Sequence, residues 1–146
     1  MAASAQCPVL AKPAAPAELT AEQVMELLQQ ELMDACTYRV LAGRVRKELR
    51  RCLLQLAREE QLHYRKLEAV YYLMTGNRPC PDRPKTPCIA CTNEELRKRY
   101  QDEVKGAAHY HALAEKAGSF SSVLHCLGHD EARHSCAVLE LLQRCL

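Results

Sequence analysis

Four glutamates interrupt apolar stripes that otherwise have the spacing of buried helix faces. They are Glu31, Glu60, Glu103 and Glu131. Two histidines, His63 and His134, follow two of these glutamates by one helical turn and lie on the same faces. Burying even one unpaired carboxylate costs several kcal/mol, so four of them in one core need protons, cationic partners or a metal. Any fold for this chain has to supply such partners.

Apolar residues recur with helical spacing in four segments, and no segment shows the sustained alternation that is typical of strands. Thr20 and Thr92 each precede a glutamine or glutamate by three residues, a capping-box pattern that predicts a helix start. Gly76 predicts the end of the second helix, and four of the seven prolines lie in the segment that follows. The sequence therefore predicts an all-α fold. Its expected parts are a flexible N-terminal arm (1–19), a helical hairpin (20–76), a crossover loop (76–92) and a second helical hairpin (92–146).

The expected turn between the first two helices, residues 45–48, contains neither glycine nor proline. An alternative is therefore that these helices continue as one and exchange between the two chains of a homodimer, so that each site draws ligands from both chains. The proline-rich loop, at about 3.3 Å per residue, is long enough to return along the bundle. Such a return makes the second and third helices parallel.

The two hairpins repeat each other. In each, a lone glutamate is followed seven residues later by a tyrosine, at Glu31 and Tyr38 and again at Glu103 and Tyr110. A Glu-x-x-His pair follows the lone glutamate after 29 residues in the first hairpin and after 28 in the second. Two Glu-x-x-His helices combined with two single-Glu helices are the arrangement of ferritin-like di-iron and di-manganese bundles. We therefore favour a metal site over a set of core polar groups that satisfy one another.

Over about residues 20–146 the sequence resembles the rubrerythrin branch of the ferritin-like superfamily. The lone Glu31 with Tyr38 and the Glu-x-x-His pair of each hairpin carry the likeness. The resemblance implies a four-helix bundle with two metal ions. It also implies a ligand set in which Glu31, His63, Glu103 and His134 are terminal and Glu60 and Glu131 are bridging.

The activity that the resemblance implies is that of a non-haem di-iron oxidoreductase that reduces peroxide in defence against oxidative stress. Its cofactor would be two iron ions, and peroxide or O₂ would be the substrate. Two alternatives remain open at this point, a metal-binding or iron-handling ferritin-like protein with little turnover and a di-manganese catalase. The ligand types do not separate iron from manganese or from a mixed pair.

Two departures from the rubrerythrin pattern affect these expectations. Rubrerythrins carry a rubredoxin domain, whereas this sequence ends at Leu146 without one, so electrons are expected from an external donor such as a rubredoxin. Rubrerythrins also have an extra carboxylate one turn along the third helix, where this chain has Gly106. The analogous carboxylate in the other half is Asp34, three residues after Glu31, which makes Asp34 a candidate extra ligand.

Tyr38 and Tyr110 are candidate catalytic residues, because tyrosines at these positions can hydrogen-bond the bridging carboxylates or carry oxidising equivalents. The alternative is that both pack in the core with satisfied hydroxyls. The other histidines lie off the ligand positions and are expected on the surface. They are His109, His111, His125 and His129.

The proline-rich loop contains Cys80, Cys88 and Cys91. Three thiols without a histidine fall short of a four-ligand structural zinc or iron site, so a redox disulfide that feeds electrons to the core, or free thiols, are the favoured interpretations. The nine cysteines are an odd number, and no complete disulfide framework is expected.

The charge pattern argues against two classes of partner. The net charge is only +2, and basic residues alternate with acidic ones, so no nucleic-acid surface is expected. No apolar run reaches the roughly 18 to 20 residues that span a bilayer, and the N-terminal segment lacks the apolar core of a secretory signal. These features predict a cytoplasmic protein that does not associate with membranes.

Overall fold

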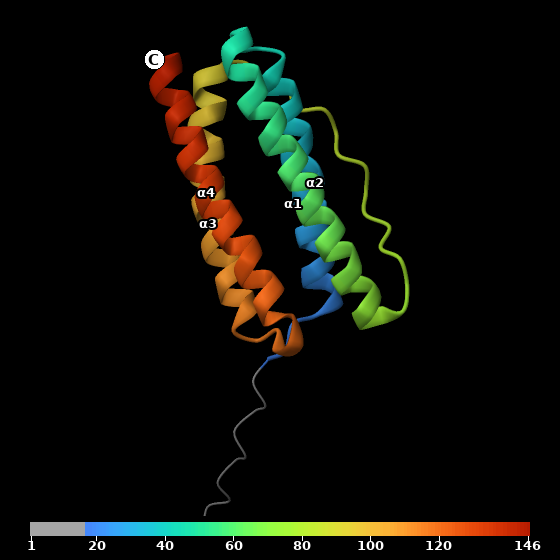
Figure 1. Ribbon diagram of the computed structural model, residues 1–146. Coiled ribbons are helices and arrows are strands. Elements are labelled where there is room, and N and C mark those ends of the chain that lie inside the picture. The colour runs from blue at the N-terminus through green and yellow to red at the C-terminus, as the bar shows by residue number, and fades with distance from the viewer. Residues whose placement is uncertain (1–16) are drawn as a thin grey trace, which may run out of the picture.

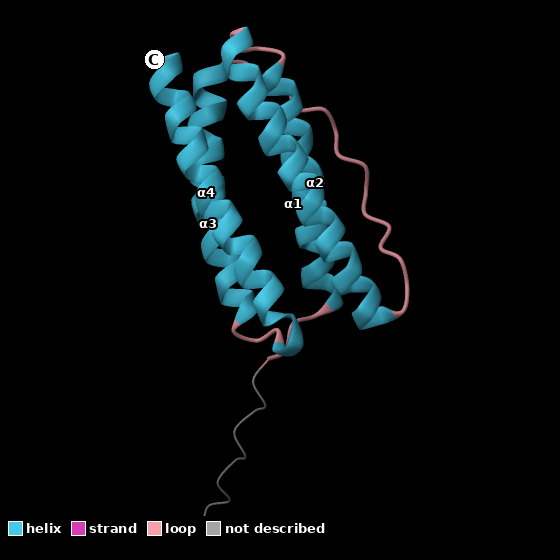
Figure 2. Cartoon of the chain, in the orientation of Figure 1, coloured by secondary structure: helices cyan, strands magenta, loops and turns pink. Residues whose placement is uncertain are grey.

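A computed structural model describes residues 17–146, and this part of the chain contains helices and no strand (Figures 1 and 2). The elements are α1 (Ala21–Ala42), α2 (Lys47–Thr75), α3 (Thr92–Ala114), a 3-10 turn (Gly118–Phe120) and α4 (Ser121–Cys145). The all-α prediction is confirmed, and the arrangement of the four helices is compatible with a four-helix bundle. None of the helices described is both long and apolar enough to cross a membrane.

The helices pack as two antiparallel pairs, α1 with α2 and α3 with α4. The segment 76–91 leaves the end of α2 and runs along the outside of the bundle to the opposite end, where α3 begins (Figure 1). This path makes α2 and α3 parallel. Two contacts hold the loop to the bundle, because Ile89 is buried and Asp82 exchanges two hydrogen bonds with Gln29 of α1, at 2.8 and 3.0 Å.

The helix ends follow the predicted signals in two places and depart from them in one. Thr20 and Gln23 form the predicted capping box, and Gly76 ends α2 with a positive φ of 73°. The capping box predicted at Thr92 is wrong. The N-cap is one residue earlier, at Cys91, and it has no side-chain cap, while the glutamate of the predicted box pairs with Arg99 instead.

The first two helices do not continue as one. The helix α1 ends at Ala42 and α2 begins at Lys47, and the Arg50 side chain donates to the Ala42 carbonyl oxygen at 3.0 Å. Of the predicted N-terminal arm, 1–19, the structure describes residues 17–19. Leu19 is buried, and its N–H donates to the Lys116 carbonyl oxygen at 3.1 Å; residues 1–16 of the arm lie outside the described residues.

The apolar core consists of two clusters with a polar layer between them. One cluster includes Leu28, Leu67 and Leu124 and lies toward the end where α1 begins. The other includes Leu53 and Leu96 and lies toward the end where α3 begins. Each fully buried leucine contributes about 1.5–3 kcal/mol to folding, and these two clusters offset the cost of the charged groups between them.

Candidate metal centre

All six predicted metal ligands are buried in the polar layer. They comprise Glu31 on α1, Glu60 and His63 on α2, Glu103 on α3, and Glu131 and His134 on α4. Helical periodicity places these residues on the inner face of each helix. The packing of the four helices brings them to one level of the bundle. We refer to these six side chains as the buried centre.

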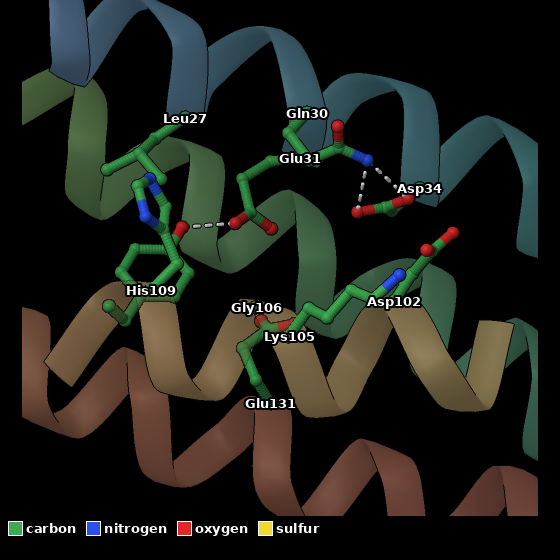
Figure 3. Close-up of a pocket in the computed structure, with 10 residues that line it drawn as sticks. Leu27, Gln30, Glu31, Asp34, Asp102, Lys105, Gly106, His109 and Glu131 are labelled. Atoms are coloured by element: carbon green, nitrogen blue, oxygen red, sulfur yellow. Dashed lines mark hydrogen bonds between the residues drawn. The ribbon is translucent and has the colours of Figure 1, made fainter. Parts of the chain in front are cut away.

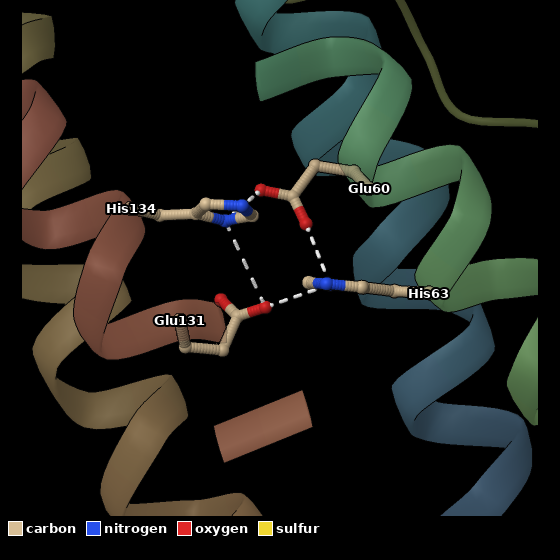
Figure 4. Close-up of side chains that lie close together, drawn as sticks. All are labelled: Glu60, His63, Glu131 and His134. Atoms are coloured by element: carbon tan, nitrogen blue, oxygen red, sulfur yellow. Dashed lines mark ion pairs between the residues drawn. The ribbon is translucent and has the colours of Figure 1, made fainter. Parts of the chain in front are cut away.

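The His63 side chain faces three carboxylates at once. Its Nδ1 atom lies 2.9 Å from Oε1 of Glu131, 3.0 Å from Oε2 of Glu60 and 3.3 Å from Oε2 of Glu31. Figure 4 shows the first two of these contacts converging from α4 and α2. One helix contributes a lone glutamate and two contribute a Glu-x-x-His pair, so three helices meet at this nitrogen.

His134 occupies the equivalent position on the other side of the buried centre. Its Nδ1 atom lies 3.0 Å from Oε1 of Glu60, 3.6 Å from Oε2 of Glu103 and 4.0 Å from Oε1 of Glu131. Glu60 therefore offers one oxygen to each histidine, and Oε1 of Glu131 lies between both (Figure 4). Glu60 and Glu131 therefore each lie within 4.0 Å of both histidine Nδ1 atoms.

The ligand atoms that point into the buried centre lack hydrogen-bond partners. They are Oε2 of Glu31, both Oε atoms of Glu60, Nδ1 of His63, Oε2 of Glu103, Oε1 of Glu131 and Nδ1 of His134. Each unsatisfied buried polar group costs about 1–3 kcal/mol. A donor set of four carboxylates and two imidazoles suits divalent transition ions, and the four residues of the two Glu-x-x-His pairs lie close enough to hold one. The residues present therefore fit a metal site.

Two further carboxylates orient the histidines. The Nε2 atom of His63 lies 3.2 Å from Asp130 of α4, and the Nε2 atom of His134 lies 2.8 Å from Glu59 of α2. Donation from Nε2–H to a carboxylate leaves the Nδ1 lone pair free for a metal. Our sequence analysis missed these two residues, although an acidic residue directly precedes the Glu-x-x-His pair in both hairpins.

The pKa values show how the buried centre balances its charge without a metal. Burial raises the pKa of Glu31 to about 8 and that of Glu131 to about 11. Burial acts in the same direction on Glu60, but its contacts with His134 and His63 lower that pKa to about 2. Burial opposes charge on the histidines, yet the carboxylates raise the pKa of His134 to about 11 and that of His63 well above its usual range. Without a metal, protons on these side chains therefore supply the positive charge that bound metal ions would provide.

The two predicted tyrosines bond to the lone glutamates, not to the bridging ones. The hydroxyl of Tyr38 donates to Oε1 of Glu103, and the hydroxyl of Tyr110 donates to Oε1 of Glu31. Each bond links the two helical hairpins and turns the other oxygen of the glutamate toward a histidine. Burial, followed by the charge of the bonded glutamate, holds the pKa of both tyrosines well above the usual value, so both stay protonated.

Asp34 is not aimed at the buried centre as a ligand. Its carboxylate accepts a hydrogen bond from Arg99, and Gln30 donates to both its oxygens at 2.9 and 3.0 Å. Arg99, itself buried, also donates to Asp102. Burial raises the pKa of Asp34 to about 7, against the opposing charge of Arg99. The candidate extra ligand is instead one half of a buried ion pair.

A pocket of about 310 Å³ opens between α1 and α3 and reaches two of the ligands, Glu31 and Glu131 (Figure 3). Leu27 lies on its α1 side, and Lys105 and Gly106 lie on its α3 side. A Cβ atom at Gly106 would be 3.4 Å from Oε2 of Glu131, so the glycine leaves the approach to that carboxylate clear. The pocket therefore extends from the surface of the bundle to two of the six buried side chains.

The remaining predicted candidates have mixed outcomes. His109 and His129 are exposed, as expected, but His111 and His125 are partly buried and lie against each other. The three loop cysteines are exposed and free, and they belong to none of the metal-ligating groups found in residues 17–146. No family model, curated protein or solved structure matches the chain. Function is therefore inferred from the geometry and chemistry of the site.

Proposed function

We propose that this protein is a ferritin-like, rubrerythrin-type oxidoreductase that binds two iron ions at the buried centre and reduces peroxide. The observation that carries the proposal is the convergence of five carboxylate oxygens on two histidine nitrogens, from four helices, with no hydrogen bond made by any of the seven atoms. A buried group of this composition is unfavourable unless protons or metal cations neutralise its carboxylates. The repeated hairpin sequence supports the same assignment, because each hairpin supplies one lone glutamate and one Glu-x-x-His pair.

The expected reaction consumes hydrogen peroxide, two electrons and two protons and yields two water molecules. A pair of iron ions, when bound, supplies the two electrons that cleave the O–O bond. This chain holds no second redox cofactor of its own in the proposal, so an external donor such as a rubredoxin has to return the electrons. The three exposed cysteines of the loop are not needed for this balance.

The protein's own side chains would bind the two ions and admit the peroxide. Glu31, His63, Glu103 and His134 would be the terminal ligands, and Glu60 and Glu131 would bridge, since their oxygens face both histidines. The pocket beside Gly106 would admit the peroxide between α1 and α3.

Two kinds of hydrogen bond would hold the ligands in place. Tyr38 and Tyr110 keep their protons and fix the lone glutamates across the hairpin interface. Glu59 and Asp130 keep the histidine nitrogens turned inward.

The test is peroxide consumption by iron-loaded protein with and without a reduced rubredoxin as electron donor. The proposal predicts turnover that requires the donor and produces no O₂. The variant Glu60→Gln, which keeps the side chain's shape but removes the bridging charge, should lose this activity. Glu48→Gln, an exposed position on the same helix, should retain it.

Two results would overturn the proposal in favour of an alternative. Evolution of O₂ from peroxide without any donor, by manganese-loaded protein, would identify a catalase. Uptake of many more than two iron ions per chain without peroxide turnover would identify an iron-handling protein. Manganese-loaded protein gives the first reading and iron-loaded protein the second, so each outcome selects one function.

A further inference from the structure

A second group of histidines lies outside the buried centre, on α3 and α4. His111 of α3 packs against His125 and His129 of α4, with ring centroids 5.1 and 4.9 Å apart. The two α4 residues are four apart in sequence, which places them on one face of the helix. We refer to these three residues as the histidine cluster. None of the six ligands of the buried centre belongs to it.

The closest pair has the nitrogen spacing of two ligands on one ion. The Nδ1 atoms of His111 and His125 lie 2.8 Å apart. Two nitrogens that each lie about 2.0–2.1 Å from a metal, at angles between 90 and 109°, are separated by about 2.9–3.4 Å. A small opening of the pair therefore accommodates a divalent ion in place of the proton that the two nitrogens share.

A carboxylate lies near one histidine of the pair, more loosely than in the buried centre. The Nε2 atom of His125 lies 3.4 Å from Oε1 of the exposed Glu115, and its Nδ1 atom is turned toward His111. His63 and His134 have the same arrangement, with Nε2 on a carboxylate and Nδ1 turned toward the ligand position. Such carboxylate contacts fix the tautomer that binds metal.

The backbone of α4 makes room for the cluster. A Cβ atom at Gly128 would lie 2.8–3.0 Å from the imidazole ring of His111, closer than atoms can approach. Glycine in a helix interior costs about 0.5–1 kcal/mol relative to alanine. The space that this glycine leaves is filled by the His111 ring, which sits between the two histidines of α4.

We propose that His111, His125 and His129 form a second metal site that binds one divalent ion with a preference for imidazole, such as Zn²⁺. The three rings do not yet present their nitrogens to one point. His129 meets His111 edge-on, and binding of the ion requires the exposed His129 side chain to rotate toward the other two. Imidazole suits Zn²⁺, Ni²⁺ and Cu²⁺, whereas the four carboxylates of the buried centre also suit iron and manganese. This site is independent of the proposed peroxide reduction.

The test is calorimetric titration of Zn²⁺ into metal-free protein, in which Zn²⁺ also fills the buried centre. Wild type is expected to bind one ion per chain beyond those that the buried centre holds. His129→Gln and His125→Gln should each weaken this binding at least tenfold. His129 is exposed, so its substitution should leave the fold intact. His109→Gln, an exposed histidine outside the cluster, is the matched control and should bind like wild type.

A second measurement distinguishes metal binding at the histidine cluster from metal binding at the buried centre. The double variant Glu60→Gln, Glu131→Gln should keep the zinc site although it loses the buried centre, so failure of one proposal leaves the other testable. Cu²⁺ added to this variant should give an electron paramagnetic resonance spectrum with coupling to three imidazole nitrogens, and to two in His129→Gln. The proposal is overturned if wild type binds no additional Zn²⁺, or if both histidine variants bind it as wild type does.

Discussion

The buried centre has two flanks, which occupy corresponding positions in the two hairpins and differ in chemistry. On the closed flank, Asp34 lies one turn after the lone glutamate of α1 and pairs with the buried Arg99. On the open flank, Gly106 lies one turn after the lone glutamate of α3. Leu27 of α1 occupies the position equivalent to that of Arg99 in α3. Asp34 and Gly106 are 72 residues apart in the sequence, and so are Leu27 and Arg99. The two lone glutamates have the same separation.

The two hairpins share the residues of the buried centre and differ in the residues beside it. The six buried side chains, the tyrosines and the carboxylates that orient the histidines are alike in both hairpins, as the proposed pair of metal ions requires. An ion pair fills one flank, where Asp34 borders the pocket, and a residue without a side chain leaves space on the other. We infer that the difference directs small molecules to the side of Gly106, where the pocket reaches Glu131.

The largest predicted effect concerns the buried centre itself, whose affinity for metal ions should depend on pH. Without metal, Glu31, Glu131, His63 and His134 carry protons at pH 7, since their pKa values lie above it. Metal binding displaces these protons, so affinity for the pair of ions rises with pH, by up to about 10⁴ per unit, or about 5.5 kcal/mol.

Calorimetry of anaerobic Fe²⁺ binding in two buffers of different ionisation enthalpy measures the number of protons released. About four per pair of ions are expected near pH 7. Release of fewer than about two would mean that the carboxyls and imidazoles are already deprotonated, and the explanation of the charge balance would fail.

On the closed flank, Arg99→Ala should destabilise the fold by about 3–5 kcal/mol, because it leaves Asp34 buried without a cation. Urea unfolding of the metal-free protein measures the loss. Arg97→Ala is the matched control, since Arg97 lies on the same helix in an exposed ion pair with Glu94 at 3.4 Å and should cost less than about 1 kcal/mol. Equal, small effects of the two variants would show that the flank is not closed by this pair.

The tyrosines should behave alike in folding and differently in turnover. Tyr38→Phe and Tyr110→Phe each remove a hydrogen bond to a buried carboxyl, so each should lower the free energy of unfolding by about 1–3 kcal/mol. Tyr110 also lines the pocket, so its substitution should slow peroxide reduction more than that of Tyr38. Identical rates for the two variants would contradict a directional approach through the open flank.

The smallest expected change in stability is on the open flank. Gly106→Ala should stabilise α3 by about 0.5–1 kcal/mol, because the added methyl group lies at an ordinary contact distance from Glu131. It should also slow the reduction of cumene hydroperoxide more than that of hydrogen peroxide, since it narrows the pocket. Ala108→Gly, an exposed position on the same helix, should show the opposite change in stability and no change in selectivity.

The sequence predicted the helices and the burial of the six candidate ligands, because both follow from spacing along one helix at a time. The ion pair of Asp34 with Arg99 was not predictable in this way, since 65 residues separate its partners and only the packing of α1 against α3 joins them. The contact between His111 and His125 escaped prediction for a related reason, because it depends on the space beside Gly128. The helix start at Thr92 was predicted wrongly because the buried Arg99 competes for the glutamate of the expected capping box.

The direct test of the buried centre is metal analysis of protein purified anaerobically from cells supplied with iron and manganese. The proposal predicts about two ions of iron and manganese together per chain. The variant Glu60→Gln, Glu131→Gln should retain almost none, and the matched variant Glu48→Gln, Glu140→Gln, changed at exposed positions of the same two helices, should retain both. A wild type that holds neither metal even after reconstitution, or a bridging-glutamate variant that keeps its full complement, would contradict the proposed metal centre.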